Sequence, residues 1–263
     1  MPEGDTIYHL AHRLDQALTG QVLTAAELRV PAHATADLTG RRVLGTVPRG
    51  KHLLTRFEGG VTLHTHLRMD GRWELFRPGE RWRGGPAFQI RALLGTERAT
   101  AVGYRLPVVQ LLRTAEEHRA VGHLGPDLLG PGWDAAEARR RLLAAPQRPI
   151  GAALLDQRNL AGIGNVYAVE LSFLAGVTPW TPVAELPDLD RLLERARQLL
   201  EANRFRPGHI TTGDTRPGCG HWVYGRTRRD CIRCGTSIRT GRHDQGRVAH
   251  WCPRCQRGPA PTS

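Results

Sequence analysis

The sequence contains a single lysine, Lys51, in a chain of 263 residues whose other basic residues are all arginine. Arginine holds its proton too tightly to act as a nucleophile or a base. The amines able to form a covalent bond with a carbonyl carbon are therefore the N-terminal α-amino group and Lys51. Since an arginine would supply charge equally well, we interpret the lysine at position 51 as functional. Chance survival of one lysine is the alternative.

The sequence also lacks any apolar run long enough to span a membrane. Its N-terminus has no charged segment followed by an apolar core, which is the pattern of a secretory signal. We therefore expect neither a membrane protein nor a secreted one. The cytoplasm is the expected location.

Negative charge is scarce in the C-terminal part of the chain. The whole sequence carries a formal net charge of +12, and residues 201–263 contain 12 arginines against 4 acidic residues. A basic patch of this kind is typical of proteins that bind a polyanion such as a nucleic acid. Solubilising surfaces and surfaces drawn to acidic membranes are the alternatives.

The pattern of apolar residues divides the chain into two parts. Residues 7–18 have helical spacing, with Asp5 or Thr6 available as the N-cap and Gly20 as the stop. Short alternating runs then predict strands that form an antiparallel sandwich next to this helix: Arg42–Val47, His52–Phe57, Val61–Leu67, Arg72–Phe76, Ala87–Leu94, Thr100–Tyr104 and Val108–Leu112.

Helical patterns replace the strands after residue 124. They cover Ala135–Leu143, Ile150–Gln157, Val166–Leu174 and Leu189–Asn203. The predicted fold class is α+β, with a β-sandwich domain over residues 1–115, a linker over 116–125, a helical domain over 126–225, a zinc finger over 226–257 and a disordered tail over 258–263.

Two histidines share one face of a predicted strand, because His64 and His66 alternate with apolar residues that face the other side. Two histidines alone make a poor metal site. A polar sheet face is the simpler reading, and phosphate contact by His66 is the functional alternative.

A glycine-rich turn, Gly162-Ile163-Gly164-Asn165, lies between two predicted helices. Its glycines allow the backbone to approach a ligand closely. At the start of a helix, its amide groups and the Asn165 side chain are suited to holding a DNA phosphate. A plain corner between two helices fits the pattern equally well.

The cysteines form the strongest local pattern. Cys231 and Cys234 are followed after 17 residues by Cys252 and Cys255, which is the spacing of a zinc ribbon. Four thiolates fill a tetrahedral shell, so we expect one structural zinc ion. Between the pairs, Thr236–Arg239 and Arg247–Trp251 are predicted strands, with Arg242 and Asp244–Arg247 in or beside the loop that joins them. Cys219 has no assigned role.

The chain begins Met1-Pro2-Glu3-Gly4. Removal of the initiator methionine leaves a secondary amine beside a carboxylate. An α-amino group has a pKa of about 7.7–8.0, so part of it is deprotonated near neutral pH and able to attack an electrophilic carbon. Taken alone, an ordinary frayed terminus explains these residues better.

These motifs, in this order along the chain, resemble those of the formamidopyrimidine-DNA glycosylase/endonuclease VIII family of base-excision repair enzymes. The resemblance rests on four segments that span almost the whole chain, and the start of the sequence is most similar to an actinobacterial type of the endonuclease VIII branch. The segments are Met1–Gly4, Arg49–Leu54, Leu155–Asn165 with its helix-two-turn-helix, and Arg247–Gln256 with its zinc finger.

The resemblance implies the role of each catalytic residue. Pro2 is the Schiff-base nucleophile and Glu3 the proton donor and relay, while Lys51 assists β-elimination and Arg247 assists δ-elimination. For DNA contact it points to Met69 as the wedge that fills the space of an extruded base, to Arg68 as a contact of the orphaned base, and to His123. His66 and Asn165, considered above as phosphate contacts, are the other candidate DNA-binding residues. The partner is damaged DNA, bound by a monomer in the bacterial cytoplasm, at the nucleoid.

Two departures from the family pattern bear on the substrate. Thr6 stands where many relatives have glutamate, so one acid of the family's site is missing. The Arg-Phe motif of the purine-directed branch is absent between Gly95 and Leu112. Both departures favour oxidised pyrimidines over 8-oxoguanine.

A second class of function also fits the basic zinc ribbon. A non-catalytic protein that binds damaged or single-stranded DNA would show salt-sensitive binding without strand cleavage. A zinc-ribbon RNA-binding factor is a weaker third reading. The joint presence of Pro2, Glu3 and Lys51 favours the enzyme, because a protein that only binds has no need of them.

Overall fold

The fold is described from a computed structural model of the chain, which describes residues 2–206 and 208–261. The chain forms two compact units. The first contains Pro2 and Ile7–His123, and the second contains Glu3–Thr6 together with the chain from Leu124 onward. The cut after His123 falls within the linker expected at 116–125. The four residues Glu3–Thr6 differ from the expectation, because they pack with the second unit.

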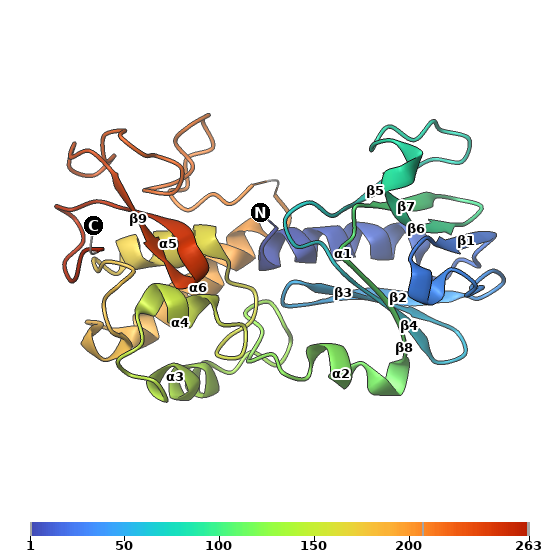
Figure 1. The fold of residues 1–263 in the computed structure, drawn as a ribbon, viewed down its shortest axis with the longest axis horizontal. Coiled ribbons are helices and arrows are strands. Elements are labelled where there is room, and N and C mark those ends of the chain that lie inside the picture. The colour runs from blue at the N-terminus through green and yellow to red at the C-terminus, as the bar shows by residue number, and fades with distance from the viewer. Residues whose placement is uncertain (1, 207, 262–263) are drawn as a thin grey trace. The chain divides into compact units, whose positions relative to one another are not determined.

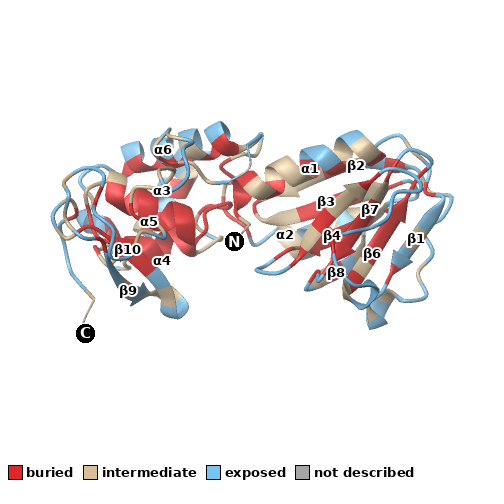
Figure 2. Ribbon diagram, turned by 90° about the horizontal axis from the view of Figure 1, so that it is seen from above, coloured by how far each residue is buried: buried red, intermediate tan, exposed pale blue. Residues whose placement is uncertain are grey.

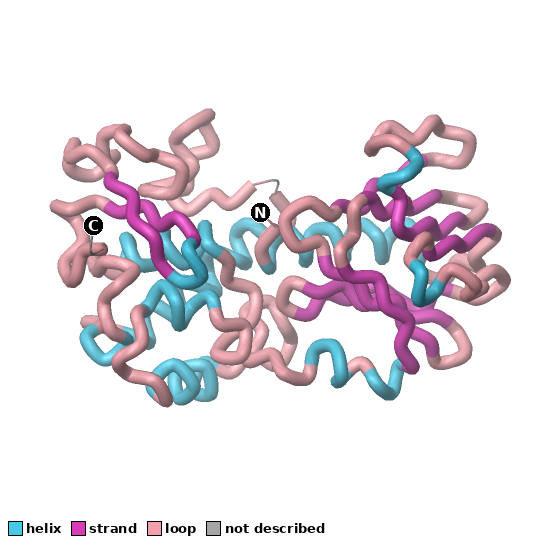
Figure 3. Tube along the Cα trace, viewed as in Figure 1, coloured by secondary structure: helices cyan, strands magenta, loops and turns pink. Residues whose placement is uncertain are grey.

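The first unit has two antiparallel sheets of four strands each (Figures 1 and 3). One sheet has the order β2-β3-β4-β8, formed by Val43–Arg49, His52–Phe57, Val61–His66 and Val108–Arg113. The other has the order β1-β6-β7-β5, formed by Ala25–Leu28, Ile90–Gly95, Thr100–Tyr104 and Arg72–Phe76. Single-turn elements complete the unit: η1 (Pro31–His33), η2 (Ala87–Gln89), η3 (Thr114–Glu116) and α2 (His118–Val121).

Helix α1 (Gly4–Leu18) supplies one side of the core of the first unit. Ile7, Ala11, Leu14 and Leu18 are at most 2% exposed and belong to the same apolar cluster as Phe57 of β3. This stripe follows the helical period read from the sequence. The helix begins earlier than predicted, at Gly4, so Asp5 and Thr6 lie inside its first turn and are not its N-cap.

Most of the predicted strands are confirmed within one or two residues. The segment Ala87–Leu94 begins as a strand only at Ile90, because Gln89 N donates to the carbonyl of Pro86 and closes a 3₁₀ turn. Strand β1 was not predicted. Its sequence, Ala-Ala-Glu-Leu, shows no clear alternation, and it lies at the edge of its sheet with β6 as its one partner.

The second unit is helical and ends in a hairpin. Its elements are α3 (Ala135–Leu143), α4 (Ile150–Leu155), α5 (Asn165–Leu174), η4 (Val183–Glu185), α6 (Leu189–Asn203), β9 (Arg239–His243), η5 (Asp244–Gly246) and β10 (Arg247–Trp251). Helix α5 lies in the centre, in contact with α4, α6 and β10, and is buried from Asn165 to Phe173 (Figure 2). None of the described helices has the length and apolar character needed to cross a membrane.

The first strand of the hairpin differs from the prediction. Thr236–Arg239 was expected, whereas the strand runs from Arg239 to His243 and pairs with Arg247–Trp251. Thr236 is taken up by the cysteine turn, where its carbonyl accepts from Cys231 N at 2.9 Å. Past the hairpin, the disordered tail expected from residue 258 differs from the structure at Pro259, whose carbonyl accepts from the Thr178 hydroxyl at 2.6 Å. Residues 262–263 lie outside the described part.

A buried carboxylate organises the approach to the hairpin. Glu170 of α5 is fully buried and accepts from the backbone N–H groups of Trp222, Val223 and Tyr224, each at 2.8 Å. The Thr211 hydroxyl donates to the same carboxylate. Four donors satisfy one charge, which is the condition for burying it without a large penalty.

Replacing Glu170 with Gln should destabilise the second unit. The carboxamide presents an N–H₂ group to backbone N–H donors, which leaves buried donors without acceptors and costs about 3 kcal/mol of unfolding free energy. Urea unfolding followed by tryptophan fluorescence measures this loss. The exposed Glu185→Gln is the matched control, and equal midpoints for the two variants would contradict the assignment.

Candidate functional site

The carboxylate of Glu3 caps the N-terminus of α5. It is fully buried and accepts from Gly164 N and Val166 N, both at 2.7 Å, and from Tyr167 N at 3.4 Å. Gly164, the N-cap residue, has no side chain to do this. The partial positive charge of the helix N-terminus favours a carboxylate at this place. Glu3 is thus fixed against residues more than 160 positions away in the sequence.

Glycines allow the start of the chain to come this close. Gly4 N donates to the carbonyl of Gly162 at 2.8 Å. A Cβ on Gly4 would lie 2.8 Å from Cα of Gly162, and a Cβ on Gly164 would lie 2.5 Å from Cδ of Glu3. A side chain at position 4 would force the two backbones apart, and one at position 164 would displace the Glu3 carboxylate. Pro2, which is half-buried, therefore sits directly ahead of an immobilised residue.

Asp5 lies next to Thr6, the position at which many relatives have a glutamate. It is 1% exposed. Its carboxylate accepts from the Tyr167 hydroxyl at 2.6 Å and from Thr6 N at 2.7 Å, and it lies 2.8 Å from His209 Nδ1. Burial, followed by the charge of Asp5, raises the pKa of Tyr167 well above its usual range. Thr6 does not supply an acid, and the Asp5 carboxylate is committed to these partners. No pattern in the sequence indicates this cluster, because its three residues lie far apart along the chain.

The polar groups of the glycine-rich turn make hydrogen bonds within the second unit. The amides of Gly164 and Val166 bind Glu3, so they are not available to a phosphate. The carboxamide of Asn165 is also engaged, since Nδ2 donates to the carbonyl of Val248 at 2.9 Å and Oδ1 lies 2.7 Å from His243 Nε2. Burial lowers the pKa of His243 to about 4, so the ring is neutral and donates from Nε2. Asn165 thus ties α5 to the hairpin.

Arg247 begins strand β10 directly after a strained loop. Gln245 has a φ of 53° and Gly246 a φ of 72°, and the first of these is unusual for a residue with a side chain. The Arg247 guanidinium donates to Gln245 Oε1 at 3.2 Å. Backbone strain of this kind is common where a loop presents a functional side chain.

Lys51 lies in a two-residue turn between β2 and β3. Arg49 pairs with His52, which leaves Gly50 and Lys51 as the turn, and Gly50 has a φ of 57°. Such a tight turn needs a residue that tolerates positive φ. Lys51 lies in this turn and is half-buried.

Histidines surround the residue that follows Lys51. The ring centroid of His52 lies 4.7 Å from that of His66 and 6.2 Å from that of His123. Burial, followed by the charge of Lys51, lowers the pKa of His66 to about 4. His66 Nδ1 accepts from Arg68 N at 2.9 Å, so its proton is on Nε2, where it is able to donate to a phosphate.

The turn after β4 exposes a large apolar side chain. Met69 is 64% exposed, which rules out its reading as a core residue. Arg68, just before it, has a φ of 45°, and Gly71 N donates to the carbonyl of Leu67 to close the turn. Apolar side chains exposed in this way are the type that inserts between stacked bases in DNA-binding proteins.

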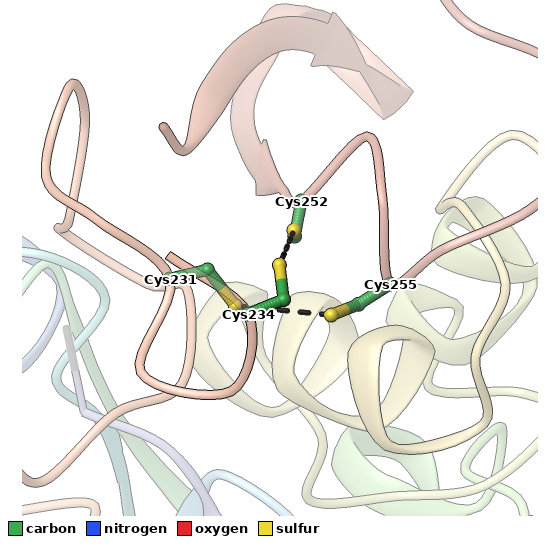
Figure 4. A group of neighbouring side chains, drawn as sticks. All are labelled: Cys231, Cys234, Cys252 and Cys255. Carbon is green, nitrogen blue, oxygen red and sulfur yellow. Dashed lines mark hydrogen bonds between the residues drawn. The ribbon is translucent and has the colours of Figure 1, made fainter. Parts of the chain in front are cut away.

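The four cysteines converge as predicted (Figure 4). The Sγ atoms of Cys231 and Cys255 lie 3.9 Å apart and those of Cys234 and Cys252 lie 3.5 Å apart, with all four within 4.8 Å of one another. Zn–S bonds of about 2.3 Å in a tetrahedron place sulfurs at similar separations. The cluster is a candidate metal site, consistent with a structural zinc finger. Cys219 is not part of it.

Each unit thus gathers part of the predicted site. The first unit brings Lys51, His66 and His123 around His52, with Arg68 and Met69 on the adjoining turn. The second unit places Glu3 beside Asn165 at the start of α5, and Asn165 joins this point to the hairpin that carries Arg247.

Known proteins resemble this chain in sequence. The family model for the formamidopyrimidine-DNA glycosylase N-terminal domain matches residues 1–104, and the model for the H2TH domain of the same enzymes matches residues 124–211. "Probable endonuclease 8 2" of Streptomyces coelicolor is 62% identical over 99% of this chain and 96% of that protein. "DNA-(apurinic or apyrimidinic site) lyase Nei2" of Mycolicibacterium smegmatis is 46% identical over 97% of this chain and 99% of that protein.

Solved structures share the fold. The structure of MutM in complex with DNA containing carbocyclic 8-oxo-G has a TM-score of 0.82 at 24% identity, covering 98% of this chain and 100% of that one. This likeness concerns the fold, whereas the sequence matches cover both family domains and nearly full-length relatives. The chain therefore belongs to the formamidopyrimidine-DNA glycosylase/endonuclease VIII family.

Proposed function

We propose that this protein is an endonuclease VIII-type DNA glycosylase and AP lyase of base excision repair. The observation that carries the proposal is the anchoring of Glu3 on α5, which holds Pro2 at the head of a fixed segment. The two relatives named above are an endonuclease 8 and an AP lyase. The protein acts on damaged DNA in the bacterial cytoplasm. It works as a monomer, because one chain carries every residue that the reaction needs.

The reaction begins with the amine of Pro2. It attacks C1′ of the damaged nucleotide, the base leaves, and the resulting iminium is already cationic because the amine is secondary. The iminium withdraws electrons from C2′ and acidifies its hydrogen. Loss of that proton expels the 3′ phosphate, which is β-elimination, and a second elimination releases the 5′ phosphate.

The remaining residues act on charge and protons. Glu3 takes up the proton that the Pro2 nitrogen loses and passes it to the ring oxygen as the sugar opens. Lys51 lends positive charge to the first leaving phosphate, and Arg247 does so for the second. His66 donates from Nε2 to a backbone phosphate, in line with its neutral ring and its Nδ1 partner.

The target base must leave the stack before Pro2 reaches C1′. Met69, as an exposed apolar side chain, fills the gap, and Arg68 contacts the orphaned base. His123 is exposed and contacts the DNA backbone. Asn165 supports the DNA-binding surface by holding the hairpin. Oxidised pyrimidines are the preferred lesions, because the chain lacks the Arg-Phe motif of the purine-directed branch.

The four-cysteine cluster holds one zinc ion in a structural role. Four thiolates leave no open position for water or substrate, and when bound the ion fixes the two cysteine turns at the base of the hairpin. The cluster's contribution to the reaction is therefore the position of Arg247.

A residue added ahead of Pro2 should abolish lyase chemistry. The added residue turns the nucleophilic amine into an amide nitrogen, while the DNA-binding surfaces are unchanged. We expect no borohydride-trapped complex and no cleavage of DNA containing an abasic site or an oxidised pyrimidine, with DNA affinity within about threefold of the authentic protein.

Mass spectrometry verifies the N-terminus in each sample and identifies the DNA ends. Cleavage by protein verified to carry the extension would refute Pro2 as the nucleophile. Binding without cleavage by the authentic protein would favour a non-catalytic DNA-binding protein. Ends that keep the sugar fragment would exclude a δ-elimination role for Arg247.

Replacing Cys234 with Ser should remove the zinc ion and most of the activity. Loss of one thiolate opens the shell, so the hairpin that carries Arg247 loses its fixed base. We expect one zinc per wild-type chain by elemental analysis, and cleavage of abasic DNA at least about 100-fold slower in the variant. Cys219→Ser is the matched control, expected to keep both zinc and activity. Full activity of a zinc-free Cys234→Ser protein would contradict the structural role.

A further inference from the structure

Three polar side chains form a line across neighbouring strands of the first unit. His64 Nδ1 lies 3.0 Å from Gln110 Oε1, and His64 Nε2 lies 2.8 Å from His52 Nδ1. The residues come from β8, β4 and β3, which are adjacent in the sheet, and His64 is 4% exposed. We call them the histidine chain. It ends at the residue that follows Lys51.

The donors and acceptors of the histidine chain run in one direction. A carbonyl oxygen accepts, so His64 carries its proton on Nδ1 toward Gln110. Its Nε2 then has a lone pair and accepts from His52 Nδ1–H. A neutral His52 therefore has no proton on Nε2. His66, beside it, has the opposite tautomer because its Nδ1 accepts from Arg68 N.

Burial keeps these rings uncharged. It is the main cause that lowers the pKa of His52 to about 3, and the nearby His66, His64, His123 and Lys51 lower it further. Burial also lowers the pKa of His64, against a smaller effect of Gln110 that raises it. At neutral pH the imidazole rings of His52 and His64 are therefore polar but uncharged.

The histidine chain also fixes the turn that carries Lys51. His52 is the closing residue of that turn, paired with Arg49 in β2. Its ring is held by His64, and its backbone is held by pairing on both sides, with β2 and with β4. Lysine has a long flexible side chain, so the point from which it starts determines what its ammonium group reaches.

We propose that Gln110 and His64 are positioning residues for β-elimination, which act through His52 to hold Lys51 in place beside uncharged imidazoles. The proposal rests on the function proposed for Lys51. It goes beyond that function because it assigns a task to three side chains that have no part in the reaction described so far.

Gln110→Met and Gln110→Glu form a matched pair for the test. Methionine keeps the length of the side chain and removes the acceptor, whereas glutamate keeps the acceptor. Gln16→Met, at an exposed position of α1, is the control for the substitution itself. Single-turnover cleavage of duplex DNA with an abasic site isolates elimination from base removal, and borohydride trapping reports iminium formation independently.

For Gln110→Met we expect elimination about 10-fold slower, with DNA affinity and trapped yield unchanged. Gln110→Glu should rescue the rate at pH 8. Its carboxylate favours the charged form of His64 and raises that pKa, so its activity should fall at a higher pH than that of the wild type as the pH is lowered. Lys51, Arg68, His66 and His123 are the other charged or titratable groups near His52, and all are the same in both variants.

A purely structural role would lower stability, affinity and trapping together, and it would show no rescue by glutamate. Elimination at the wild-type rate in Gln110→Met would likewise overturn the proposal. If the wild-type protein itself gives no trapped complex, the proposed function fails and not the histidine chain alone.

Nitrogen-15 NMR of the histidine rings tests the chain without any reaction. We expect His64 and His52 to be protonated at Nδ1 and His66 at Nε2, at pH 7. The variant His64→Phe removes the acceptor of His52 Nδ1–H, so His52 should lose its fixed tautomer. A wild-type His52 that is protonated at Nε2 would overturn the proposal, whether or not the variants are active.

Discussion

The contact between the Glu3 carboxylate and the N-terminus of α5 is the constraint on which the rest of the site depends. A buried charge needs several donors, and backbone N–H groups at a helix N-terminus supply them with fixed geometry. The same contact favours glycine at positions 4 and 164, because a Cβ on Gly4 would collide with the backbone of Gly162 and a Cβ on Gly164 would collide with the Glu3 carboxylate itself. It turns the first residues of the protein, which would otherwise fray, into part of the second unit.

The polar groups around the site are mostly uncharged or already paired. His52, His66 and His243 all have a lowered pKa, with burial as the main cause. The side chains of Asn165 and Glu170 form hydrogen bonds with other residues of the second unit. The groups that we propose to act on DNA are the two amines and the guanidinium of Arg247.

Much of this was accessible from the sequence. Alternation and helical spacing gave the sandwich, α1, α3 and α6, because those elements bury one face and expose the other. The cysteine spacing identified the cluster, and the single lysine pointed to Lys51. Met69 was placed by resemblance alone, and its exposure agrees with that placement.

Other features were out of reach because they depend on contacts between distant segments. Nothing local to the turn Gly162–Asn165 reveals that Glu3 occupies the amides of Gly164 and Val166. Asp5, His209 and Tyr167 meet from three separate regions. Of the histidine chain, only His64 was singled out from the sequence, for the face that it shares with His66, whereas Gln110 lies on a strand more than 40 residues later. The shift of strand β9 follows from the cysteine turn, which consumes Thr236.

The identity of the amine that bonds to DNA is the most direct measurement. The protein with its authentic N-terminus is incubated with abasic-site DNA, reduced with borohydride and digested, and the peptide that carries the sugar remnant is identified by mass spectrometry. Because Lys51 is the one lysine of the sequence, two peptides are able to carry it. The remnant is expected on the peptide that begins with Pro2. A remnant on the peptide of Lys51 would contradict the assignment of the nucleophile and the role given to the anchored Glu3.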